Sequence, residues 1–203
     1  AILLTLMNAP QIINRFSDVI AEIENVHINY KIIVSILIFA YLGRRIDVDF
    51  LYELWGTSVN DKNFKRNQAI LQIISFDSDN IRMRSSIAAQ FILNNATDPN
   101  LIVDTLISMM RKINDRCIIN KMYRDYWKEL VRYANLSYIF PENGRREAII
   151  RYYEAIKELD QSYNHPLFWL QYAIACITLN EYDRAEYYLD TADSLAKKWD
   201  WDL

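Results

Sequence analysis

The chain has 203 residues, 52% of them hydrophobic, with 23 basic and 26 acidic side chains and a formal net charge of −3. This balance excludes a protein held on nucleic acid or anionic lipid by a general positive field. The longest apolar run, residues 32–42, is much shorter than the roughly 20 residues of a membrane-spanning helix, and no basic segment precedes the apolar start as in a signal peptide.

Cysteine and histidine usage limits the chemistry further. Cys117 and Cys176 both fall at apolar helical positions, which is typical of reduced, buried thiols and indicates a cytoplasmic protein. His27 and His165 lack neighbours at metal-ligand spacing, and the scattered glycines form no phosphate-binding loop or dinucleotide fingerprint. We predict that the chain is not an enzyme and holds no metal or cofactor of its own.

The first 29 residues are predicted to belong to a preceding domain. The chain is apolar from Ala1 onward and has no initiator methionine. We therefore expect residues 1–29 to be a helical segment that continues from upstream.

Residues 30–97 are predicted to form a compact module that opens with three helices. The first, residues 30–42, is densely apolar and ends at Gly43, because glycine favours the left-handed backbone of a helix end. The second is short, follows capping aspartates and ends at Gly56. The third covers residues 61–74.

A hairpin and a closing helix complete this module. Residues 75–76 and residues 81–84 flank a turn at residues 77–80, and the second arm alternates apolar and polar side chains as a strand does. Serine at 85 or 86 then caps a helix that extends through Ile92. Three helices, a small hairpin and a closing helix describe a winged-helix domain.

Residues 98–203 are predicted to form paired helices. Two helices of one hairpin each carry an apolar stripe at the spacing i, i+3 or i+4, and i+7. The stripe residues are Trp169, Tyr172, Ala173 and Cys176 in the first helix, and Ala185, Leu189, Ala192 and Ala196 in the second. This pattern resembles the tetratricopeptide repeat, with small residues where the backbones must approach.

A second, weaker copy of the pattern lies upstream. Ala148, Tyr152 and Ala155 repeat the spacing of the last helix about 37 residues earlier, against a family period of about 34 residues. The partner of this helix is expected to be one continuous helix over residues 123–139, closed by the breaker run at residues 141–144. The whole chain is therefore predicted to be mainly α, a winged-helix module followed by tetratricopeptide-like hairpins.

The order of helical segment, winged helix and repeats resembles the region that follows the nucleotide-binding core of STAND NTPases. In that family a Met-His-Asp triplet lets its histidine contact the phosphate of the bound nucleotide. Met83, Arg84 and Ser85 stand at the corresponding positions here, so an arginine replaces the histidine. The resemblance implies Arg82 and Arg84 as nucleotide-sensing candidates, since a guanidinium offers bidentate contacts to phosphate.

By this resemblance the chain is the regulatory and sensor region of a signalling NTPase of the antiphage-defence type. ATP would be bound by an upstream domain, which the winged helix would hold inactive. The repeats would recognise a protein trigger, and the implied output is a homo-oligomer of the full-length protein. No membrane partner is expected.

A DNA-binding transcriptional regulator is the alternative function. The predicted third helix presents basic and amide side chains that can contact phosphates and base edges in a major groove. The basic candidates are Lys62, Lys65 and Arg66. Asp61 adjoins this cluster and the chain is acidic overall, so we rank internal regulation above DNA recognition.

Overall fold

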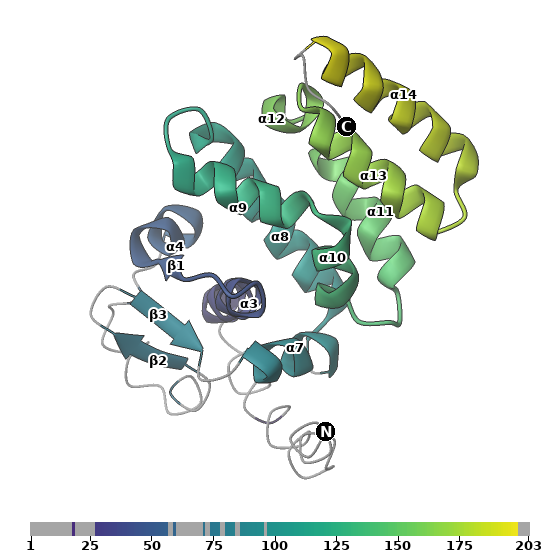
Figure 1. Cartoon of the computed structure of the whole chain (residues 1–203). Coiled ribbons are helices and arrows are strands. Elements are labelled where there is room, and N and C mark those ends of the chain that lie inside the picture. The colour runs from purple at the N-terminus through teal and green to yellow at the C-terminus, as the bar shows by residue number, and fades with distance from the viewer. Residues whose placement is uncertain are drawn as a thin grey trace. The chain divides into compact units, whose positions relative to one another are not determined.

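The computed structural model describes residues 18, 27–56, 59, 71, 74–77, 80–83, 86–95 and 97–198. Within these ranges the chain is mainly helical, as predicted (Figure 1). It divides into two compact units. The first unit comprises Ala1–Thr105 with Ile139–Glu142, and the second comprises Leu106–Tyr138 with Asn143–Leu203. The division falls inside a helix, a few residues beyond the boundary at residue 98 that the sequence suggests.

The first unit is built on helix α3, His27–Tyr41. Residues 32–39 are all buried, which explains the dense apolar run without any need for a membrane. The helix ends where predicted, at Gly43 with φ +64°. Ser35 is buried in the middle of the run, and its hydroxyl donates to the Lys31 carbonyl and accepts from the Trp55 indole nitrogen at 3.1 Å. A buried polar group is thereby satisfied.

Helix α4, Val48–Trp55, carries the capping residues that the sequence predicts. The Asp47 carboxylate accepts a hydrogen bond from the Asp49 backbone N–H at 2.7 Å. Gly56 closes the helix with φ +66°, and its N–H donates to the Tyr52 carbonyl. Helix α4 is therefore fixed at both ends by local sequence.

The strands of the first unit form a three-stranded antiparallel sheet in the order β1-β3-β2. The strands are β1, Ile46–Asp47, β2, Ile74–Asp77, and β3, Asn80–Met83. The predicted hairpin is confirmed, with Asp77 opposite Asn80 beside the turn. Ile74 begins a strand, so the expectation that a helix runs to this position is wrong. Helix α7, Ser86–Asn95, follows the sheet.

Helix α8, Pro99–Arg116, leads into the second unit, where α9, Lys121–Val131, and α10, Tyr133–Ile139, follow. The prediction of one continuous helix over residues 123–139 is wrong, because Arg132 is extended with ψ 120° and separates α9 from α10. No glycine or proline marks this break. It depends on contacts with residues distant in sequence.

Tertiary hydrogen bonds satisfy the backbone groups that this break exposes. The carbonyls of Leu130 and Val131 accept the hydroxyls of Tyr152 and Tyr153 at 3.1 and 2.7 Å. The N–H of Tyr133 donates to the side-chain oxygen of Gln171 at 2.9 Å. The break is therefore part of the fold, because these three hydrogen bonds replace the helical partners that the backbone groups lack at the break.

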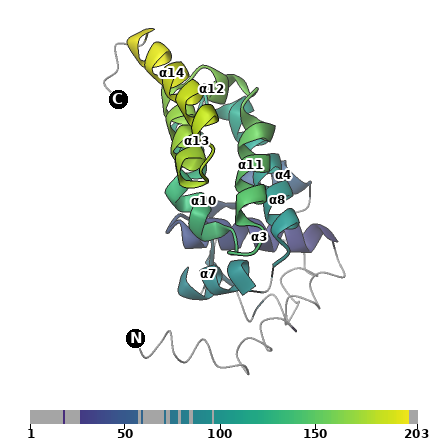
Figure 2. The same cartoon turned by 90° about the vertical axis from the view of Figure 1, so that its right-hand side faces the viewer.

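The remaining helices of the second unit are α11, Arg145–Ile156, the short α12, Asp160–Tyr163, α13, Pro166–Thr178, and α14, Tyr182–Lys198. Gly144, in the predicted breaker run, precedes α11 with φ +76°, and Pro166 opens α13. Helices α13 and α14 lie side by side in both views (Figures 1 and 2). They form the predicted hairpin.

Candidate functional site

The α13–α14 hairpin brings together most of the residues that the sequence assigns to repeat packing. The buried ones are Trp169, Tyr172, Ala173, Ala185 and Ala192. Alanine side chains let the two backbones approach closely, and the Trp169 indole nitrogen donates to the Tyr163 carbonyl at 2.9 Å. The centroids of the Trp169 and Tyr188 rings lie 5.3 Å apart.

Leu189 departs from the prediction, because its side chain is 39% exposed. Tyr188 is buried in its place, at 6% exposure. Both positions lie within one turn of Ala185, so helical spacing alone admits either. Tyr188 takes the buried position because its ring stacks on Tyr172 and its hydroxyl reaches a carboxylate on α11. Leucine at position 189 offers neither interaction.

A column of three tyrosine rings joins helices α11, α13 and α14. The Tyr153 and Tyr172 rings are stacked with centroids 4.7 Å apart and an interplanar angle of 9°. The Tyr172 and Tyr188 rings are stacked at 4.2 Å and 24°. Each ring comes from a different helix, so the column fixes the α13–α14 hairpin to the helix before it.

Glu154 on α11 binds the hydroxyls of two rings of this column, while the hydroxyl of Tyr153 donates to the Val131 carbonyl. One carboxylate oxygen accepts the hydroxyls of Tyr172 and Tyr188 and the guanidinium of Arg184, and the other pairs with Lys157 at 2.8 Å. Partial burial alone would raise the pKa of the Glu154 carboxyl, but the hydrogen bonds from Lys157 and Tyr172 outweigh it and lower that pKa. The carboxylate is held charged and fully occupied. Sequence reasoning missed this group, because three of its four partners are 18 to 34 residues away.

The two thiols are inert by environment. Burial raises the pKa of Cys117 to about 11, against a smaller opposing effect of the nearby Arg124 guanidinium. Burial likewise raises the pKa of Cys176 to about 11. A nucleophilic cysteine needs a lowered pKa, so both residues act in packing, as the sequence predicts.

His165 serves α13 as its N-cap. Its Nδ1 accepts the Leu167 backbone N–H at 3.2 Å, and its ring lies 4.8 Å from the Trp127 ring. Burial, assisted by the positive charge of Lys128, lowers the pKa of His165 to about 4. The imidazole is therefore neutral near pH 7, which leaves Nδ1 free to accept.

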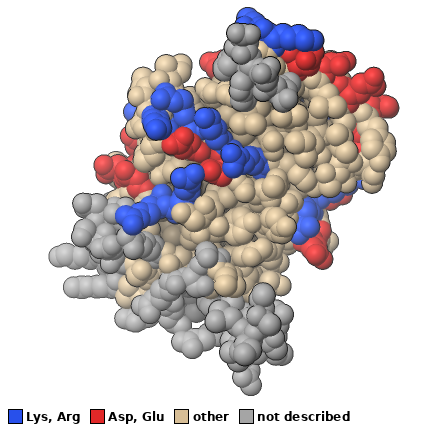
Figure 3. All heavy atoms as spheres, viewed as in Figure 1, with Lys and Arg blue, Asp and Glu red and all other residues tan. Residues whose placement is uncertain are grey.

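The surface of the second unit carries charges of opposite sign on different helices. Exposed basic side chains on α9 form what we call the basic stripe, Lys121, Arg124 and Lys128. Exposed acidic side chains on α14 form the acidic stripe, Asp183, Glu186 and Asp190. Figure 3 shows basic side chains gathered over α9 and acidic ones over α14. Glu181 is not part of the acidic stripe, since it pairs with Arg146 on α11.

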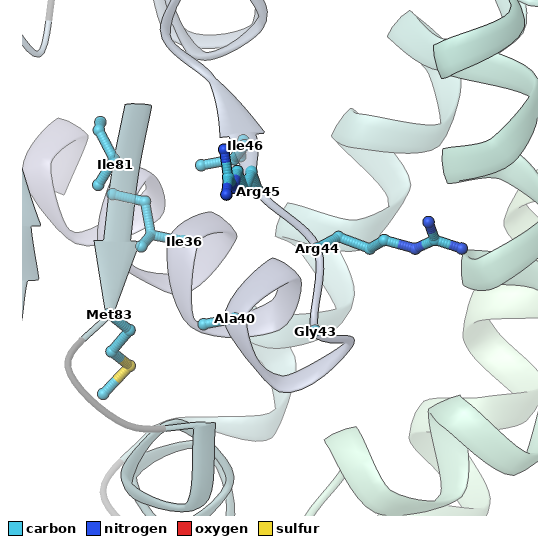
Figure 4. A pocket seen from close by; sticks show the side chains of 8 residues that line it. All are labelled: Ile36, Ala40, Gly43, Arg44, Arg45, Ile46, Ile81 and Met83. Atoms are coloured by element: carbon cyan, nitrogen blue, oxygen red, sulfur yellow. The ribbon is translucent and has the colours of Figure 1, made fainter. Parts of the chain in front are cut away.

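A small hollow in the first unit lies between the end of α3 and strand β3 (Figure 4). Its volume is about 230 Å³, and its walls include Ile36, Ile46, Ile81 and Met83. Three of these side chains are buried, and Figure 4 shows Arg44 extending away from them. This volume is below the roughly 300 Å³ at which small-molecule sites begin, so we assign no ligand to it.

The nucleotide-sensing and DNA-binding candidates stay predictions. Arg82 lies on β3 with its backbone opposite Ser75, but its side chain and all of Arg84 lie outside the described residues. Lys62, Lys65 and Arg66 also lie outside them. In the described ranges no helix is long and apolar enough to cross a membrane, and no group of three metal-ligating side chains is found there.

Comparisons with known proteins complete the description of the site. No family model matches the chain, and neither the curated proteins nor the solved structures contain a significant match. The function therefore has to be argued from the residues of this chain.

Proposed function

We propose that the chain is a non-catalytic regulatory region in which the second unit recognises a protein. The observation that carries this is the fixing of α11, α13 and α14 by the tyrosine column and the Glu154 network. A preformed helical scaffold binds a partner without ordering itself first, which is the use that helical repeats make of such surfaces.

The chemical state of the perturbed groups supports this proposal. Shifted pKa values commonly mark catalytic sites, but here each shifted group already has a structural task. Glu154 accepts four donors, His165 caps a helix, and the thiols are shielded by burial. None of these groups is poised to transfer a proton or attack a substrate.

The resemblance to STAND NTPases extends the proposal to a signalling role. The order helix, short strand, helix, antiparallel hairpin and helix in the first unit supports a winged-helix module, and the α13–α14 hairpin supports a tetratricopeptide-like repeat. Such a region would hold an upstream nucleotide-binding core inactive until a protein trigger, in antiviral defence a foreign protein, engages the repeats. The trigger must bind the active and resting forms with different affinity, since equal binding shifts nothing.

Three measurements on the chain test this proposal. Calorimetric titration with ATP should give no tight binding, and an affinity below about 1 μM would contradict a region that leaves nucleotide binding to another domain. Gel shifts with duplex DNA should show no sequence-selective, salt-sensitive complex, and such a complex lost on Lys65→Ala with Arg66→Ala would favour the DNA-binding alternative. A photo-crosslinker at exposed Tyr187 should capture protein, whereas one at exposed Tyr52, in the first unit, serves as the matched control.

A further inference from the structure

The basic stripe on α9 is a positively charged surface that fits a negatively charged partner. Lys121, Arg124 and Lys128 occupy positions i, i+3 and i+7, so all three project from one face of the helix. All are exposed, while the opposite face buries Tyr123, Trp127 and Leu130. The Arg124 guanidinium also donates to the carbonyls of Cys117 and Ile118 at 3.0 and 3.2 Å, which fixes the middle of the stripe.

The acidic stripe on α14 has the same geometry with the opposite sign. Asp183, Glu186 and Asp190 also stand at i, i+3 and i+7, and all three are exposed. Because both helices rise by the same amount per residue, the three charges of one stripe lie opposite the three of the other when the helices are laid side by side. The charges of the two stripes therefore have the same spacing along their helices.

These two surfaces do not meet within the second unit. Figure 3 shows the basic side chains over α9 and the acidic side chains over α14 on separate parts of the molecule. Helices α11 and α13 come between them in the chain, and the column Tyr153, Tyr172 and Tyr188 holds α14 against those two helices. Each stripe therefore remains available to a second copy.

We propose that the second unit associates head to tail, with the basic stripe of one copy seated on the acidic stripe of the next. Different surfaces meet in such a contact, so it is heterologous and leaves one stripe open at each end. Exposed ion pairs are individually weak and are screened by salt, so the association is reversible and strongest at low ionic strength. The inference does not depend on the NTPase resemblance or on the protein trigger.

Charge-reversed variants test this contact by sedimentation velocity at low salt. Wild type should show an average mass that grows with concentration and falls to the monomer in about 0.5 M salt. A basic-reversed variant, Lys121→Glu with Lys128→Glu, and an acid-reversed variant, Asp183→Lys with Asp190→Lys, should each weaken association at least about tenfold. Mixing the two variants should restore it, because each then offers the surface that the other lacks.

The matched control is Arg111→Glu with Arg151→Glu, which changes net charge as much as the basic-reversed variant but lies on α8 and α11, off both stripes. It should associate like wild type, and circular dichroism should show every variant folded. A wild type that stays monomeric at low salt would overturn the proposal. So would a mixture that fails to associate, or a basic stripe that instead binds heparin or duplex DNA.

Discussion

Two helix contacts of the second unit, that of α13 with α14 and that of α9 and α10 with α11, are held by different interactions. In α13–α14 buried alanines stand beside Trp169 and the stacked rings of Tyr172 and Tyr188, so small side chains and rings share the contact. In α9–α10 with α11 the contact is filled by rings, and the hydroxyls of Tyr152 and Tyr153 bond to a broken helix. The first contact joins two uninterrupted helices, whereas in the second the hydroxyls of aromatic residues satisfy an interruption.

Truncation of the Trp169 indole should cause the largest loss of stability in the α13–α14 hairpin. Trp169→Ala removes a side chain that is only 6% exposed, so a cavity at the helix contact should cost about 3–5 kcal/mol. Urea unfolding with an unchanged slope would measure it. Glu186→Ala, on the exposed face, should stay within about 0.5 kcal/mol. Equal stability of both variants would show that the hairpin is not packed through Trp169.

Overpacking of the α13–α14 contact should cause the next largest loss of stability. Ala185 is 3% exposed against α13, so Ala185→Leu adds atoms where no room exists and should cost about 1–3 kcal/mol. The comparison variant is Ala155→Leu, at the position that the sequence pattern equates with Ala192 in α14. Ala155 is only half-buried, so this substitution should lower the unfolding free energy by less. If the order of the two melting temperatures is reversed, burial does not set the cost of overpacking at these two alanines.

The N-cap of α13 gives the α13–α14 hairpin a pH dependence through one buried imidazole, that of His165. The pKa of His165 is about 4 in the folded chain and 6.5 as its ordinary value, so the unfolded state takes up the proton first as pH falls. The stability that the neutral His165 gives to the folded chain is complete above pH 6.5 and is lost as pH falls toward 4. Unfolding free energy should drop by about 2 kcal/mol from about pH 7.5 to about pH 5.

The matched variant for this pH effect is His165→Asn. Asparagine also caps helices but does not titrate, so the drop over this interval should disappear, while the lost ring contact with Trp127 lowers stability by the same amount at every pH. A drop of unchanged size in the variant would assign the effect to other groups.

The smallest loss of stability should follow removal of one hydroxyl from the contact of α9 and α10 with α11. Tyr153→Phe leaves the buried Val131 carbonyl without its 2.7 Å partner and should cost about 1–2 kcal/mol. Tyr187→Phe, on an exposed ring, should change stability by less than about 0.5 kcal/mol. No difference between the two would mean that the break at Arg132 needs no hydroxyl to support it.

Features that the sequence predicts well are those set by local chemistry. Gly43, Gly56 and Gly144 all adopt positive φ at helix boundaries, Asp47 caps α4, and Pro166 opens α13. Each of these effects acts over a few residues, so a single chain displays it without knowledge of the fold. The hairpin of β2 and β3 follows from alternation in the same way.

Features that the sequence does not predict are set across distance. The break at Arg132 is held by residues 22 and 38 positions away, and nothing local signals it. The choice of Tyr188 over Leu189 is made by the Tyr172 ring and the Glu154 carboxylate, which lie on other helices. Strand β1 has two residues, too few for a period to appear. Tertiary contacts decide between local alternatives of equal merit in these places.

The interrupted helix also supplies a natural reporter. The amide proton of Tyr133 stands just after the break and is held by the side chain of Gln171, which belongs to α13. Its exchange with deuterated solvent therefore requires this bond to α13 to open, although Tyr133 itself lies on α10. One amide signal can in this way report on the contact between α10 and α13, and any molecule that loosens or clamps that contact will change its exchange rate.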